Sequence, residues 1–115
     1  MATLAHVKKQ ALIKLGVATP HQAPKSYQDD EMQIAYNEVY TKLENKTLAF
    51  WAKTGPVPDE VVNDVASMMA WTRANDYGIS SERYQRLANE RARAEPNIRY
   101  LSVNRYLSVD EPEDF

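Results

Sequence analysis

The 115-residue sequence contains no cysteine, which excludes disulfide bonds and cysteine-ligated zinc or iron–sulfur sites. It has only three glycines, too few for a glycine-rich phosphate-binding loop. No apolar run is long enough to cross a bilayer. Residues 1–16 have the spacing of an amphipathic helix and lack the apolar stretch of a signal peptide. We therefore expect a small domain from a reducing compartment that has no membrane contact.

The charge of the chain is small but unevenly distributed. The net charge is −2, which argues against a protein that coats nucleic acid over its whole surface. The segment DEPEDF at 110–115 holds four acidic residues, so residues 1–109 carry a net charge of +2. Six of the seven arginines lie between Arg83 and Arg105, which allows a local basic face.

The apolar residues recur at helical spacing in four segments, so we predict helices at 3–15, 27–52, 59–76 and 81–95. Thr3, Ser26 and either Ser80 or Ser81 are suited to cap three of them. The third segment is apolar on more than one face and should be the most buried. The predicted fold is all-α, a four-helix bundle over residues 1–96 followed by an extended C-terminal arm over 97–115. The fourth helix is expected to end before Pro96.

The arm contains one hexapeptide twice, RYLSVN at 99–104 and RYLSVD at 105–110. Because the period is even, an extended strand would place Leu101, Val103, Leu107 and Val109 on one face. Tyr100 and Tyr106 would share the opposite face with the two serines. An isolated strand is not stable alone, so this pattern predicts an arm that docks on a partner, with Phe115 as a final apolar contact. The alternative is a loosely ordered terminus.

The sequence shows no arrangement typical of catalysis or metal binding. His6 and His21 lack metal-ligand spacing, and the adjacent acids at 29–31 should diverge on a helix. We interpret the two tryptophans, Trp51 and Trp71, as core anchors in preference to ligand-stacking platforms. The expected protein is not an enzyme and uses no cofactor.

Arginines in the fourth segment allow two interpretations. Positions 83, 86, 90 and 93 fall along one stripe that holds three arginines and one glutamate. Interleaved charges usually form a solvated face with local ion pairs. The alternative is a helix that faces phosphates through Arg83, Arg86 and Arg93.

The order of these features resembles the head–tail adaptor proteins of tailed bacteriophages, especially those of short-tailed phages. The resemblance covers most of residues 4–95. Its pieces are ALIKLGV at 11–17, a proline-containing loop, a long helix with Tyr36, Val39, Leu43-Glu44 and Trp51, a Gly-Pro-Val-Pro turn, and a helix with Val65-Ala66 and Ala70 that ends in Asp76-Tyr77-Gly78-Ile79.

The resemblance implies a structural virion protein located in the neck between head and tail and assembled in the host cytoplasm. Such adaptors form a homo-oligomeric ring, usually a dodecamer, under the portal protein after DNA packaging, link it to a tail or nozzle protein, and help retain the packaged DNA. Their C-terminal arms reach along the portal. The implied portal-binding residues are Tyr100, Leu101, Val103, Tyr106, Leu107, Val109 and Phe115, and Arg83, Arg86 and Arg93 would make non-specific contacts with DNA in the ring's lumen.

Two alternatives from other classes stay open. One is a small helical DNA-binding regulatory protein that uses the fourth helix for recognition, which the acidic net charge disfavours. The other is a hydrolytic enzyme with a through-space carboxylate pair, for which no nucleophile or base is evident.

Overall fold

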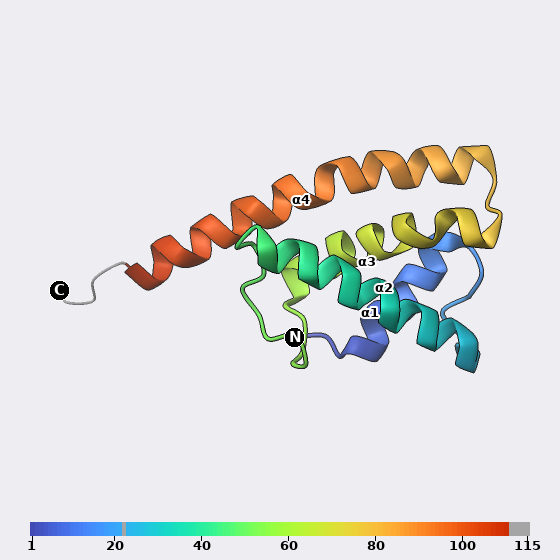
Figure 1. Cartoon of the computed structure of the whole chain (residues 1–115), viewed down its shortest axis with the longest axis horizontal. Coiled ribbons are helices and arrows are strands. Elements are labelled where there is room, and N and C mark those ends of the chain that lie inside the picture. Colours follow the sequence, from blue (N-terminus) through green and yellow to red (C-terminus); the bar gives the residue numbers. More distant parts are fainter. Residues whose placement is uncertain (22, 111–115) are drawn as a thin grey trace.

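The computed structural model describes residues 1–21 and 23–110, with side chains up to Val103. In these residues the chain forms four α-helices and one short 3-10 helix and contains no β-strand (Figure 1). The all-α class predicted from the sequence is confirmed. The helices are α1 (Leu4–Leu15), α2 (Ser26–Asn45), α3 (Asp59–Arg73), η1 (Ala74–Tyr77) and α4 (Ser81–Asp110).

Local signals in the sequence set several helix ends. The Oγ1 atom of Thr3 accepts the backbone N–H of His6 at 3.2 Å and caps α1, as predicted. Gly16 ends α1 in the left-handed region, with φ of 80°. At the start of α4, the Oγ atom of Ser80 accepts the N–H of Arg83. Lys25, and not Ser26, is the N-cap residue of α2.

The predicted end of the second helix, at residue 52, was wrong. Helix α2 stops at Asn45 because Thr47 adopts a positive φ of 61° and reverses the chain. The N–H of Leu48 then donates to the carbonyl of Leu43 at 2.8 Å. Leu48 and Trp51 return to the core from a loop, and their spacing imitates a continued helical stripe.

Helix α3 lies at the centre of the bundle and packs against α1, α2 and α4. It buries side chains on several faces, as the sequence predicted; they are Val61, Val65, Ala66, Ser67, Met68, Met69 and Ala70. Trp51 is also buried, and its Nε1 donates to the hydroxyl of Tyr36 at 3.0 Å. The interpretation of Trp51 as a core anchor is therefore confirmed.

The predicted end of the fourth helix, before Pro96, was also wrong. Helix α4 runs through Pro96 to Asp110, and the predicted domain division between residues 96 and 97 falls inside it. Pro96 and Ala92 both lie on the exposed face, so water can satisfy the carbonyl of Ala92, which lacks its helical partner. Ile98 and Ser102 are buried on the opposite face and hold the helix against the bundle.

The extended conformation predicted from the alternation is consequently wrong for residues 97–103, which are helical. Ile98, Leu101 and Ser102 follow helical spacing on the packed side. Figure 1 shows a bend partway along α4 and its C-terminal part projecting beyond the other helices. Residues 111–115, including Phe115, lie outside the described residues.

Candidate functional site

Arg83, the first of the predicted DNA-facing arginines, is bound to the end of α1. Its Nη1 donates to the carbonyl of Lys14 at 3.3 Å, and the side chain is half-buried. The guanidinium covers Gly16 so closely that a Cβ there would lie 2.7 Å from the Cζ of Arg83. A cation at a helix C-terminus also complements the helix dipole. Arg83 is thus separated from the other two predicted arginines and stabilises the packing of α4 on α1.

Arg86 and Arg93 are exposed on one flank of α4, seven residues apart. Glu90 lies between them in sequence, but its carboxylate turns inward. Its Oε1 accepts from Lys14 Nζ at 2.8 Å and from Ser67 Oγ at 3.0 Å. Burial alone would raise the pKa of Glu90, yet these hydrogen bonds and the charges of Lys14 and Arg86 bring it below its usual value. Glu90, the one acid in the predicted basic stripe, is therefore paired with Lys14.

The helical conformation places some of the predicted portal-binding residues on the exposed side of α4 and another against the core. Tyr100 and Val103 are 63% and 51% exposed. Leu101 is partly buried against the core, so it is a packing residue of α4 and less available as a docking anchor. Tyr106, Leu107 and Val109 belong to α4, but their side chains lie outside the described part of the chain.

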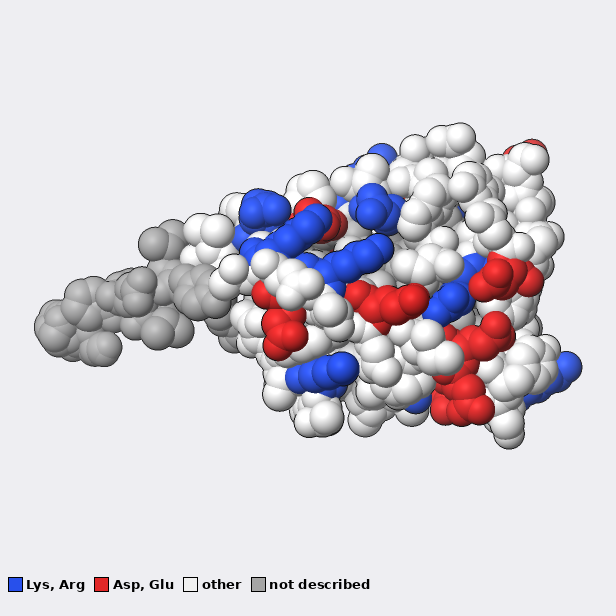
Figure 2. Space-filling view, in the orientation of Figure 1, with Lys and Arg blue, Asp and Glu red and all other residues white. Residues whose placement is uncertain are grey.

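A groove that the sequence did not predict lies between α2 and α4, with α3 beneath it, and has a volume of about 470 Å³. Val39, Met68 and Trp71 contribute its apolar lining. The ring of Trp71 lies 4.8 Å from that of Tyr84, which is 38% exposed. Figure 2 shows lysine and arginine side chains gathered over α2 and α4 on this face, with acidic side chains among them.

Cations outnumber acids around the groove. Lys46 Nζ bonds both carboxylate oxygens of Glu95 at 2.9 and 3.0 Å, and Arg99 approaches the same carboxylate at 3.7 Å. The hydrogen bond from Lys46 and the charges of Lys46, Arg99 and Arg91 lower the pKa of Glu95. Lys42 and Arg91 are exposed on opposite sides of the groove. One acid is thus shared by several cations, which leaves positive charge available to a partner.

The sequence held a partial signal for this groove. Lys42 lies in the last turn of α2, and Lys46, four residues later, is the residue that directly follows this helix. Arg91, Glu95 and Arg99 follow the same spacing on α4. Each row predicts charges along one helix face. Only the packing of α2 and α4 on either side of α3 brings the two rows together.

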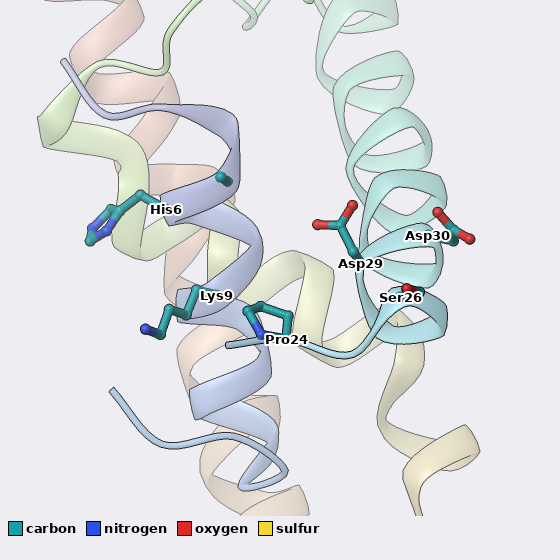
Figure 3. Close-up of a pocket in the computed structure, with 7 residues that line it drawn as sticks. His6, Lys9, Pro24, Ser26, Asp29 and Asp30 are labelled. Atoms are coloured by element: carbon teal, nitrogen blue, oxygen red, sulfur yellow. The ribbon is translucent and has the colours of Figure 1, made fainter. Parts of the chain in front are cut away.

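A second hollow, of about 530 Å³, lies between α1 and the start of α2. Figure 3 shows that its polar side chains do not converge: His6 and Lys9 point to one side, and Asp30 points away from α1. Asp29 is paired with Lys8 at 3.5 Å. His6 and His21 are both exposed, as expected of surface histidines. This hollow offers no catalytic geometry.

Within the described residues, no cluster of histidine and acidic side chains has the geometry to hold a metal ion. In the same part of the chain, no helix combines the length and the apolar character needed to span a bilayer. Comparison of the chain with models of protein families, with curated proteins and with solved structures found no match.

Proposed function

We propose that this protein is a head–tail adaptor of a tailed bacteriophage. It forms a ring under the portal, links the portal to the next tail component, and helps retain the packaged genome. The observation that carries the proposal is the order of sequence features across residues 4–95, described above. The all-α bundle is the architecture that this resemblance implies.

The projecting end of α4 supports a portal-binding role for the C-terminal region. Tyr100 and Val103 expose apolar surface beside the packed residues Ile98 and Ser102. Full burial of a large apolar side chain contributes about 1.5–3 kcal/mol, and every copy in a ring would contribute its own helix end. The element that would meet the portal therefore begins as a helix, and the docking residues Tyr106, Leu107 and Val109 belong to the same helix.

The exposed pair Arg86 and Arg93 supports contact with packaged DNA. Neither residue lies on the side of α4 that packs on the bundle, so both are free to approach phosphates. Such contacts are independent of sequence and weaken with salt. Arg83 does not belong to this surface because its side chain is hydrogen-bonded to the end of α1.

Portal binding tests the proposal. A chain that ends at Val103 keeps the buried Ile98 and Ser102, whereas a chain that ends at Asn97 loses both. We expect the first truncation to stay folded by circular dichroism but to bind portal rings of the same phage more weakly than the full-length chain, because it keeps only Tyr100 and Val103 of the exposed docking residues. A full-length chain that neither binds those rings nor enters virions would refute the adaptor function. A monomer or dimer that instead binds one specific DNA duplex would indicate the regulatory alternative.

A further inference from the structure

The groove between α2 and α4 has the features of a peptide-binding site. Met68 and Val39 are buried in its floor, and Trp71 and Tyr84 leave part of their rings open to solvent. An apolar or aromatic side chain can therefore be buried there without displacing the core. Exposed aromatic surface next to polar side chains is typical of interaction sites.

The rim of the groove selects for the charge of its occupant. Lys42 and Arg91 are exposed, and Lys46 and Arg99 share the single carboxylate of Glu95. Glu38 is already paired with Arg73 at 2.9 Å. The occupant that complements this surface is an acidic segment with at least one aromatic residue.

We propose that the groove binds the acidic segment 110–115, DEPEDF, of a second copy of this chain. Glu111, Glu113 and Asp114 would face the rim formed by Lys42, Lys46 and Arg91. Phe115 would occupy the floor beside Trp71 instead of a site on the portal, which leaves residues 100–109 for portal binding. This segment combines four acidic residues with one aromatic residue and no base, which matches the groove in both charge and apolar character.

A chain cannot place this segment in its own groove. Helix α4 carries Tyr84 and Glu95 at the groove and continues to Asp110. At a rise of 1.5 Å per residue, Asp110 lies about 39 Å along the helix from Tyr84 and about 22 Å from Glu95. Residues 111–115 span roughly 17 Å when fully extended, too short to return. The contact must therefore be made between copies.

This contact is head-to-tail, because each copy offers one groove and one acidic segment. Repetition of such a contact produces a closed ring when the rotation closes and a filament when it does not. The inference deepens the proposed function, since it gives the adaptor ring a contact between subunits. The contact itself requires only this chain, so it can be tested without the portal.

The test measures self-association of the full-length chain by sedimentation equilibrium at low and high salt. The groove variant is Lys42→Glu with Arg91→Glu, which leaves the Lys46–Glu95 pair intact. The segment variant is Glu111→Lys with Glu113→Lys and Asp114→Lys. The matched control is Lys25→Glu with Lys53→Glu, which reverses two exposed charges away from the groove.

We expect the wild-type chain and the control to associate weakly, with an affinity that falls as salt rises. The groove variant and the segment variant should each weaken association by about tenfold or more. An equimolar mixture of the two should restore it, because the basic segment of the segment variant meets the acidic groove of the groove variant. A wild-type chain that stays monomeric, a groove variant that associates normally, or a mixture without recovery would overturn the contact. Failure to bind the portal with intact self-association would refute the adaptor function alone.

Discussion

At the scale of single residues, Gly16 and Arg83 form one unit that joins α1 to α4. Gly16 is in the left-handed region, where a Cβ is unfavourable, and the guanidinium of Arg83 fills the space that a side chain would need. Gly78 also has a positive φ, of 57°, but a Cβ there would meet no atom within 4 Å. The two glycines therefore separate the conformational cost of alanine from the steric cost.

We predict that Gly78→Ala lowers the free energy of unfolding by about 1 kcal/mol, from backbone strain alone. Gly16→Ala should cost more, because Arg83 must also leave the carbonyl of Lys14. Urea denaturation of both variants measures the difference. In an Arg83→Ala background the excess cost of Gly16→Ala should largely disappear, and an unchanged excess would contradict the steric explanation.

Glu90 joins three helices through Lys14 and Ser67. Because its pKa in the folded state is lowered, its contribution to stability is present above the ordinary glutamate value of 4.5 and is lost as the pH falls through the lowered value. We predict that Glu90→Gln lowers the free energy of unfolding by about 1–2 kcal/mol near neutral pH. The difference in free energy of unfolding between this variant and the wild type should shrink as the pH falls through the lowered pKa of Glu90.

Asp64 provides a control because its pKa is shifted in the opposite direction to that of Glu90. Burial raises its pKa above 3.8, although the hydrogen bond from Asn97 and the charge of Lys14 oppose the shift. Its ionisation therefore reduces stability as the pH rises above 3.8, and Asp64→Asn should remove that loss. Denaturation curves across acidic pH check both signs. Parallel pH profiles for the two variants would contradict the assignment.

At the scale of helices, Pro96 shows why the length of α4 was not predictable. A proline normally ends a helix because it removes a backbone hydrogen bond and disfavours the helical conformation of the residue before it, and the repeat after Pro96 alternates as a strand would. The spacing of Ile98, Leu101 and Ser102 also fits one face of a helix, and burial on the bundle decides between the two. Tertiary packing therefore overrides the local signal.

Helix α2 shows the opposite error. The stripe that ends with Leu48 and Trp51 fits a helix, but both residues reach the core from a loop after the reversal at Thr47. Periodicity predicted the four helices, most of their starts and the buried third helix. It could not predict which polar rows face each other across α3, because that depends on how the helices are packed. The groove was missed for this reason.

We predict that Pro96→Ala stabilises the protein, because alanine restores the hydrogen bond to the carbonyl of Ala92 and removes a helix-breaking ring. Proline in a helix interior costs about 3 kcal/mol relative to alanine, and the exposed position and the bend recover part of this. The expected gain in free energy of unfolding is about 1–2 kcal/mol. Thermal denaturation measures it, with Pro24→Ala in the loop before α2 as the control. Destabilisation by Pro96→Ala would mean that the bend is required for packing.

At the scale of the whole molecule, α4 presents different surfaces on two flanks. Arg91 and Arg99 belong to the side near α2 and the groove, whereas Arg86 and Arg93 lie on the other side. Arg91 and Arg93 are two residues apart, about 200° around the helix axis. A neighbouring copy that fills the groove would therefore leave the second flank free. Subunit contact and DNA contact would then belong to separate sets of basic residues.

This separation makes a prediction about virions. Arg86→Glu with Arg93→Glu should leave assembly on the portal intact but reduce the fraction of particles that retain their genome, because reversed charges repel phosphates in the lumen. Lys42→Glu with Arg91→Glu should instead reduce the amount of adaptor per particle. Complementation of an adaptor-deficient phage, with DNA content and adaptor copy number measured in purified particles, distinguishes the two defects. Normal genome retention with the first variant would mean that Arg86 and Arg93 form a solvated face and do not contact DNA. An equal loss of adaptor with both variants would show that the two flanks are not functionally separate. A change in DNA content could then not be assigned to contacts in the lumen, because the ring itself would not have assembled.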